Sequence, residues 1–542
     1  MRSEGGKRRG AGYASPFALV FVFAALSTVG CRVNQDDIHR WETTAHGPDK
    51  LQAVLIHDKY ELPLRVDAVM SLVRMKPRGG RHVGIGVLVD GLTAVAPEPR
   101  QAIMAGVVPL LIAELQKPPP VAQAGQPSPP DGSYPYKDAA YALLTTDKTP
   151  LITDEALAKS LKQALVAWAM ADFEHRLDNR TQTYGMEQLL RFIGAESVTG
   201  MPKLMTRESR RLDQMSTMVA ELGSAETKEA ASKALVAIAS FVISDEWVKV
   251  KTPELQAANA ASKLQPTEAQ FKGQLGQYQD EELFRVFGSM KKVGGRAAVG
   301  FALGFAADKN QSEKRRQAAL AAIEGRLDRN SDEDVKRILE VASGDAPDGV
   351  LDQAFRRIGE MPREKVVDKL YELFKSDKWR VRRAAAGTVL RMSTLKHLDE
   401  FMSKLPDGKG FAMPEALTYG ALFADLKDGS PKEALAKHLT SGSATARTSA
   451  IGYYYTFGSK ADLGVLRPLE GDTTRAPTCD GDPECTWSCV IAKPGATKPD
   501  ETESKNVETI GDFVRYCVEP AMSTREPEKP GGNAPLPKEE KK

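Results

Sequence analysis

The chain has 542 residues, which is too long for one small core and requires several domains or an array of repeats. Hydrophobic residues make up 42% and charged residues 27%, a globular composition that excludes a disordered chain and a multi-spanning membrane protein. Lys and Arg number 74 against 72 Asp and Glu, so the formal net charge is only +2. This balance disfavours a surface that coats nucleic acid, and we expect no nucleic-acid partner.

Residues 1–30 have the pattern of a secretory signal peptide. A positively charged start is followed by an almost wholly apolar run over residues 16–26 and then by small residues. The apolar run is too short to span a bilayer comfortably, although a plain signal anchor is an alternative. Removal of this segment, which carries a net charge of +3, would leave the mature chain at −1.

The end of this segment, Ser27-Thr28-Val29-Gly30-Cys31, resembles the lipobox of bacterial lipoproteins. The resemblance implies that Cys31 becomes the first mature residue and carries acyl chains such as palmitate through its thiol and amine. Arg32 follows the cysteine, where an inner-membrane retention signal has Asp. The resemblance therefore implies a lipid anchor in the outer membrane, on its periplasmic or surface face, with ordinary secretion as the alternative.

Four further cysteines gather near the C-terminus: Cys479, Cys485, Cys489 and Cys517. An even number in an oxidising compartment predicts two disulfides, for which three connectivities exist. A turn-forming Asp-Gly-Asp-Pro sequence separates the first two cysteines, so we favour pairing Cys479 with Cys485 and Cys489 with Cys517. The alternative is a four-cysteine zinc site, but the C-x2-C pairs usual in such sites are missing. We expect a small disulfide-bonded cap over residues 466–518.

Between residues 49 and 465 the sequence predicts an all-α fold. Helix starts are indicated where a capping side chain or a proline precedes an apolar pattern, as at Thr252-Pro253-Glu254, Pro266-Thr267-Glu268 and Ser430-Pro431. Alternating β-branched runs are nearly absent, and Pro or Gly interrupts the chain about every fifteen to twenty residues. This spacing predicts short, paired helices.

One pattern recurs along these helices: an alanine with Arg or Lys three residues before it and an apolar residue four residues after it. Residues four apart share one face of a helix, so the pattern predicts a buried stripe where alanine lets a neighbouring helix approach closely. Some alanines are 35 and 31 residues apart, and other gaps are near twice that spacing. The clearer copies centre on Ala68, Ala319, Ala385 and Ala450, and the weaker ones on Ala140, Ala231 and Ala354.

The copy Val381-Arg382-Arg383-Ala384-Ala385 resembles the V-R-x-x-A pattern in the second helix of HEAT repeats. The resemblance covers residues 49–465 and implies an α-solenoid of about ten to twelve stacked helical hairpins, with a concave surface that binds proteins or peptides. An irregular all-α domain without true repeats is the alternative.

Other segments are expected to lie outside regular helices. Lys117 to Pro135 contains seven prolines and is either an inserted loop or a domain boundary. We expect a tether over residues 31–48, after the signal peptide. Residues 519–542, with five prolines and alternating charges, are expected to be a disordered tail.

The sequence Asp328 to Asp334 places oxygen ligands at alternate positions, as a calcium-binding loop does. Glu333 occupies the position where such a loop needs glycine. Helix capping by Ser331 or Asp332 is therefore the favoured interpretation. A second acidic group, at residues 480–484, is better explained as a turn in solvent.

No motif of catalytic chemistry is recognisable, and we expect neither a metal nor a cofactor. Gly84-Ile85-Gly86 lacks the third glycine of a dinucleotide fingerprint and favours a closely packed helix start. The seven histidines include no His-x3-His pair. Tyr453-Tyr454-Tyr455 is expected to bury at most two of its rings.

These features predict a lipid-anchored, extracytoplasmic scaffold that binds a protein partner and is not an enzyme. Some HEAT-like families, such as the phycobilin lyases, are enzymes or chromophore chaperones, so an activity of that type is one alternative. A lipoprotein that binds cell wall or glycan is another, and an exposed aromatic stripe would favour it.

Overall fold

The computed structural model describes residues 33–75, 83–121, 129–146, 150–180, 182–343, 345–406, 413–426, 428–477, 487–493, 495 and 501–527. Within these residues the protein is all-α apart from one two-stranded sheet, which confirms the predicted fold class. The chain divides into two compact units, residues 1–200 and 201–542. The proline-rich segment 117–135 is not the boundary between them, because it connects two helices of the first unit.

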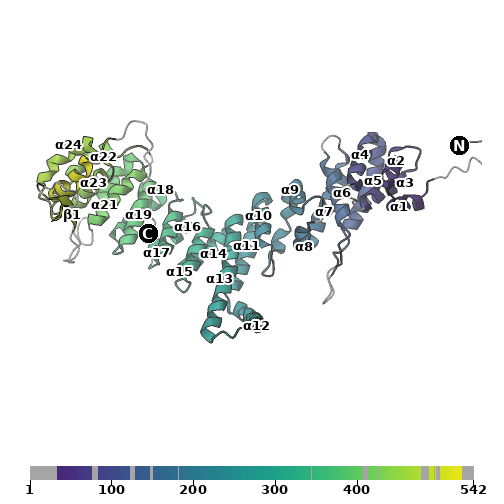
Figure 1. The fold of residues 1–542 in the computed structure, drawn as a ribbon, viewed down its shortest axis with the longest axis horizontal. Helices are drawn as coiled ribbons and strands as arrows, with labels where there is room; N and C mark the ends of the chain where they lie inside the picture. Colours follow the sequence, from purple (N-terminus) through teal and green to yellow (C-terminus); the bar gives the residue numbers. More distant parts are fainter. Residues whose placement is uncertain are drawn as a thin grey trace, which may run out of the picture. The chain divides into compact units, whose positions relative to one another are not determined.

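The first unit consists of helices that pack against their neighbours in sequence (Figure 1). α3 packs on α2 and α5, and α5 packs on α7. The elements are α1 (Gln35–Trp41), α2 (Gly47–Ile56), α3 (Leu62–Arg74), α4 (Val83–Ala94), α5 (Pro97–Leu115), α6 (Tyr134–Thr145), α7 (Glu155–Ala171), α8 (Phe173–Asp178), α9 (Met186–Ile193) and η1 (Ala195–Val198).

The expected tether over residues 31–48 is wrong in its later part, which contains α1 and the start of α2. Asn34 and Asp37 form a capping box, in which each side chain accepts a hydrogen bond from the other residue's backbone amide. Ile38 is fully buried and joins α1 to the core. The signal peptide and Cys31 lie outside the described residues.

The second unit arranges most of its helices in two layers. α13, α15, α17, α19, α21 and α23 follow one another in one layer, and α14, α16 and α18 follow one another in the other. The elements are η2 (Met201–Lys203), α10 (Leu212–Leu222), α11 (Ala225–Val242), α12 (Asp245–Ala261), α13 (Glu268–Val293), α14 (Arg296–Ala307), α15 (Glu313–Ala322), α16 (Asp332–Ser343), α17 (Asp348–Ile358), α18 (Arg363–Glu372), η3 (Leu373–Lys375), α19 (Trp379–Arg391), η4 (Leu395–His397), α20 (Leu398–Lys404), α21 (Met413–Leu422), η5 (Phe423–Asp425), α22 (Lys432–Ala436), η6 (Lys437–Thr440), α23 (Ala444–Phe457), η7 (Lys460–Asp462), α24 (Leu463–Leu466), η8 (Arg467–Gly471), β1 (Ser488–Ala492), β2 (Thr502–Asn506), α25 (Ile510–Phe513), the π-turn η9 (Val514–Val518) and α26 (Glu519–Ser523).

The predicted pattern of buried alanines is confirmed. In the second unit the pattern also explains a doubled gap, because α21 supplies Ala416, 31 residues after Ala385 and 34 residues before Ala450. Met413 holds the basic position of this copy, so the sequence pattern missed it. The alanines of the pattern all have no exposed surface: Ala68, Ala140, Ala231, Ala319, Ala354, Ala385, Ala416 and Ala450.

The basic residue of the pattern makes a bond that the sequence analysis did not anticipate. Among the described residues, six helices have an arginine as their fourth residue that donates to a backbone carbonyl in the last turn of the preceding helical segment or directly after it. Such carbonyls lack a partner within their own helix, so the guanidinium group caps one helix from the first turn of the next. The six bonds join Arg65 to Leu55 (2.9 Å), Arg100 to Leu92 (3.4 Å), Arg176 to Trp168, Arg316 to Ala306 (2.6 Å), Arg382 to Ser376 (2.6 Å) and Arg447 to Ser441 (2.9 Å).

Most predicted helix starts agree with the structure, but Pro253 lies inside α12 instead of beginning it. Ser244 caps this helix by accepting a hydrogen bond from the backbone of Trp247, whose ring is fully buried. The burial of Trp247 therefore sets the start of α12 ahead of the proline. Thr267, in contrast, caps α13 as predicted, in a capping box with Gln270.

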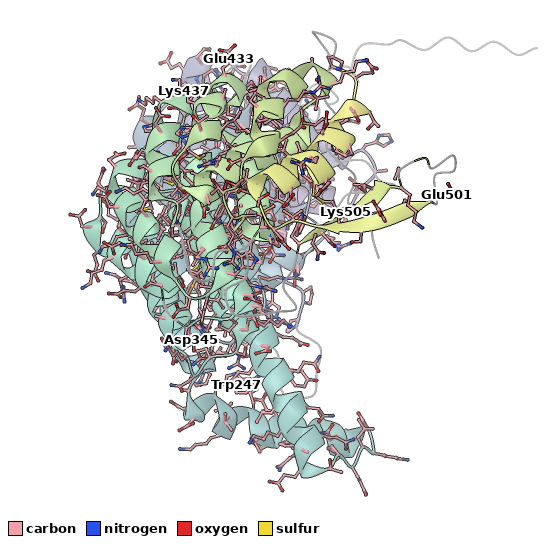
Figure 2. The ribbon with its side chains drawn as sticks, turned by 90° about the vertical axis from the view of Figure 1, so that its left-hand side faces the viewer. Trp247, Asp345, Glu433, Lys437, Glu501 and Lys505 are labelled. Carbon is pink, nitrogen blue, oxygen red and sulfur yellow. A yellow bond between two sulfur atoms is a disulfide. The ribbon has the colours of Figure 1, made fainter. Side chains whose placement is uncertain are left out.

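The predicted disulfide between Cys489 and Cys517 is present and joins β1 to η9. β1 and β2 form an antiparallel hairpin, which stands away from the helices in Figure 2 near the labelled Glu501 and Lys505. A two-stranded hairpin alone is marginally stable, so its bond to the buried Cys517 stabilises it. Cys479 and Cys485 lie outside the described residues.

The predicted tail begins too early at residue 519. Residues 519–523 form α26, in which Met522 is fully buried. Arg525 then donates a hydrogen bond to the backbone carbonyl of Tyr455 in α23 (2.5 Å). Apolar burial and this bond extend the folded part at least to Arg525, while residues 528–542 lie outside the described chain.

The buried alanines should be sensitive to size. Ala231→Leu in α11 should lower the free energy of unfolding by about 1 to 3 kcal/mol, because a larger side chain overpacks a closed interface. The adjacent Ala230 is exposed, so Ala230→Leu should change it by less than about 0.5 kcal/mol. Urea denaturation followed by circular dichroism measures both values, and equal effects would contradict the assigned helix face.

Candidate functional site

The acidic loop at 328–334 caps a helix, as the sequence analysis favoured. The Ser331 hydroxyl accepts a hydrogen bond from the Asp334 amide (3.2 Å). Arg296 binds both carboxylate oxygens of Asp334 at 2.7 Å, and the Asp328 amide donates to the same group at 2.9 Å. Burial would raise the pKa of Asp334, but these bonds outweigh burial and hold the pKa below its usual value. The carboxylate therefore joins α14 to α16.

The glycine and tyrosine motifs are explained by packing. A Cβ atom on Gly84 would lie 2.3 Å from the carbonyl oxygen of Leu72, so the start of α4 touches α3 as predicted. Tyr453 and Tyr454 are buried. Tyr455 is half-buried, and its ring lies 5.8 Å from that of Phe513 in the C-terminal cap.

A buried lysine in the first unit is a candidate for chemistry because burial lowers the pKa of Lys137, against the opposing effect of Asp138. Its ammonium group lies 2.5 Å from Asp138 and 2.9 Å from Gln182. Asp138 also accepts hydrogen bonds from the amides of Thr183 (2.9 Å) and Tyr184 (3.2 Å). Lys137 has no exposed surface, so a substrate has no access to it. These bonds fix the loop before α9 onto α6.

The described residues form neither a metal-binding cluster nor a membrane-spanning helix. Across the described ranges, no group of three or more His, Cys, Asp or Glu side chains is arranged to hold a metal ion. The same residues include no helix that combines the length and the apolar character needed to cross a bilayer.

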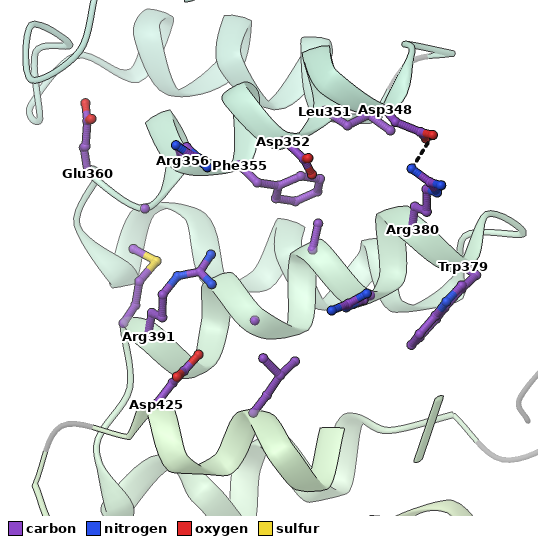
Figure 3. A pocket seen from close by; sticks show the side chains of 16 residues that line it. Asp348, Leu351, Asp352, Phe355, Arg356, Glu360, Trp379, Arg380, Arg391 and Asp425 are labelled. Carbon is purple, nitrogen blue, oxygen red and sulfur yellow. Dashed lines mark ion pairs between the residues drawn. The ribbon is translucent and has the colours of Figure 1, made fainter. Parts of the chain in front are cut away.

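A groove of about 1150 Å³ crosses three successive helices of the second unit (Figure 3). α17 forms one wall, and α21 with η5 forms the other. α19 lies between them and forms the floor of the groove. Ala384 and Gly387 are so small that the middle of this floor lies close to the helix backbone. Trp379 and Arg380 lie at one end, and Arg391 lies at the other. The groove is open to solvent, unlike an enclosed pocket for a small molecule.

Charged side chains dominate this groove. Arg380 forms an ion pair with Asp348 across the end that contains Trp379. Arg356, Arg383 and Arg391 are exposed, and none of them has a carboxylate at ion-pair distance within the described part of the chain. The groove therefore presents three guanidinium groups whose charge is not neutralised by contact.

A buried ion pair behind the groove holds α19 in place. Arg382 binds both carboxylate oxygens of Glu415 in α21, at 2.5 and 2.9 Å, and its remaining nitrogen bonds the Ser376 carbonyl. The bond to Glu415 raises the pKa of Arg382. Tyr419 donates to the same carboxylate (3.3 Å), and burial followed by the Glu415 charge raises the pKa of Tyr419. Consecutive residues of a helix point in different directions, so Arg383, the next residue along α19, faces the groove while Arg382 is buried.

Sequence reasoning placed Arg383 and Ala384 in the repeat pattern but did not find the groove. A usable signal lies two residues after each anchor alanine, on the opposite helix face. The neighbouring helices α17 and α21 have Arg356 and Thr418 there, whereas α19 has Gly387. A glycine with larger side chains at the same position of both neighbouring helices is the sequence feature that makes the hollow. Gly452 holds this position in α23, but it packs against Leu417 of α21.

Comparison with protein-family models and with curated protein sequences finds no match to this chain.

The buried pair gives a direct test of how α19 is held. Arg382→Met should lower the free energy of unfolding by about 3 to 5 kcal/mol, because it leaves the Glu415 carboxylate buried and unpaired. Adding Glu415→Gln should recover part of this loss, because it removes the buried, unpaired negative charge. Arg383→Met, at the exposed neighbour, should have an effect below about 0.5 kcal/mol. A fully stable Arg382→Met protein in urea denaturation would contradict the assignment.

Proposed function

We propose that the chain is a lipid-anchored, extracytoplasmic HEAT-like α-solenoid that binds a protein partner in the bacterial cell envelope and catalyses no reaction. The groove across α17, α19 and α21 is the single observation that carries the binding role, and Cys31 is the proposed lipid attachment site, with the outer membrane as the proposed location.

The repeat geometry supports the solenoid part of the proposal. Buried alanines recur at 31 to 35 residues in five successive helices of one layer, from Ala319 in α15 to Ala450 in α23. In three of these helices the fourth residue is an arginine bonded to the preceding helical segment. Stacked units with the same internal contacts are the defining property of a solenoid.

The groove has the composition of a protein-binding surface. Arg and Trp dominate the binding energy of many protein interfaces, and Arg383, Arg391 and Trp379 line this groove. Glycan-binding surfaces favour a stripe of exposed aromatic rings. Of the two aromatic residues that line the groove, Phe355 is buried, which leaves Trp379 alone. Lys137 is enclosed, so this lysine does not support the enzyme alternative.

Site-specific photo-crosslinking tests the binding role. A benzoylphenylalanine residue replacing Ala384, on the floor of the groove, should form a reproducible adduct with an envelope protein in intact cells. The same residue replacing Lys369, which is exposed on α18 in the other layer, should not form that adduct. Immunoblotting of the two crosslinked proteins makes the comparison.

A third variant distinguishes the groove from its surroundings. Gly387→Trp fills the hollow without changing any charge, so it should abolish most of the adduct formed from position 384. Identical adducts from positions 384 and 369, or none from position 384, would refute the proposed site.

The proposed anchor has its own test. Cys31→Ser should yield an unlipidated precursor that no longer partitions with membranes, because serine offers no thiol for acylation. Labelled palmitate incorporation measures this directly, with Cys489→Ser as a control that retains Cys31. Equal labelling of the Cys31→Ser protein and the wild type would rule out the lipid anchor.

A further inference from the structure

Four guanidinium groups and four carboxylates, those of Asp348, Asp352, Glu360 and Asp425, line the groove over α19, and three of the guanidinium groups contact none of these carboxylates. Of its four arginines, only Arg380 has a carboxylate partner among the described residues, Asp348. Arg391 donates to the Thr388 hydroxyl (3.1 Å), a neutral acceptor, and Arg356 and Arg383 extend from adjacent helices. Guanidinium groups are weakly hydrated and form two parallel bonds to one carboxylate, which makes them suited to an interface with acidic side chains.

The apolar part of the groove lies between these arginines. Gly387 has no side chain, and the guanidinium of Arg391 lies 3.3 Å from where its Cβ would be. Leu422 of α21 closes the hollow on one side, 3.7 Å from the same point. A ligand side chain that entered here would contact Leu422 while Arg391 remained within reach of a neighbouring acidic group.

We infer that the groove binds an acidic segment of its protein partner, with carboxylates on Arg356, Arg383 and Arg391 and an apolar side chain over Gly387. This inference rests on the proposed function and specifies the partner's chemistry. Arginine clusters are a recurrent way of recognising acidic motifs. The segment lies across α19 because the small residues of that helix leave room there.

Two aspartates of the groove argue against the other large anionic partner, a lipid membrane. Asp352 in α17 and Asp425 in η5 line the same hollow as the arginines. A flat anionic surface would meet both signs of charge at once, whereas a peptide can place its carboxylates on the arginines and its amide groups near the aspartates.

Fluorescence anisotropy with synthetic peptides tests the inference on the purified chain. The probe is a fluorescein-labelled peptide of repeating Glu-Leu-Glu-Ser units, and its counterpart has Lys in place of Glu. The acidic peptide should bind at least about tenfold more tightly than the basic one, and its affinity should fall as salt is raised. Vesicles that contain phosphatidylglycerol serve as the lipid alternative.

Charge reversal in the groove locates the binding. The double variant Arg383→Glu with Arg391→Glu should bind the acidic peptide at least about tenfold more weakly than the wild type does. Lys336→Glu with Lys369→Glu makes the same change in net charge on exposed positions of α16 and α18, and it should have little effect. If the reversed groove variant fails to fold by circular dichroism, Arg383→Gln with Arg391→Gln replaces it.

Three results would overturn the inference: equal binding of the two peptides, equal loss of affinity in the two double variants, or binding of the vesicles without binding of the acidic peptide. If the acidic peptide does not bind but position 384 still gives a groove-specific crosslink, only the proposed acidic chemistry of the partner is refuted. Failure of both would refute the proposed function as well.

Discussion

The helix pairs depend on one recurring interaction, a buried guanidinium group that donates to a carbonyl at the end of the preceding helix. An arginine keeps its charge in proteins, so burying it is costly unless its donors are satisfied. The last carbonyls of a helix have the opposite need, because they lack an intrahelical partner. One bond satisfies both groups. Arg65 in the first unit and Arg316 in the second make this bond in the same way, each from the fourth residue of its helix to the second-last residue of the helix before it.

The groove follows from the same arrangement. Arg382 makes the bond to the Ser376 carbonyl and also pairs with Glu415, so α19 is held both to the preceding helical segment and to α21. On this side of α19, Ala385 packs closely against the layer. The opposite side carries Arg383 and Gly387, and the rigidity of the helix fixes where those residues stand. Holding a binding surface on packed helices in this way limits the entropy lost when a partner binds.

Sequence reasoning succeeded where a signal was local and periodic. The register of the alanines, the cap at Thr267 and the pairing of Cys489 with Cys517 all depend on spacing, and the structure confirms each of them. It failed where burial decided between two starts, as at Pro253, which lies inside a helix anchored by Trp247. The groove was missed for a further reason, which is that it depends on how side chains of three separate helices lie relative to one another. Arg356, Arg383 and Arg391 have no carboxylate partner among the described residues, which is a property of their surroundings that no residue pattern records.

Hydrogen exchange of an Arg316→Met variant tests the central interaction most directly. The substitution keeps much of the apolar stem but leaves the Ala306 carbonyl of α14 without its guanidinium donor. Our account predicts faster exchange of the backbone amides in α14 and α15, with α21 and α23 unchanged, because α14 and α15 pack on α11, α13, α16 and α17. Lys314→Met, in the same first turn of α15, should leave exchange as in the wild type. Unchanged protection in the Arg316→Met protein would contradict the view that these buried arginines hold the helix pairs together.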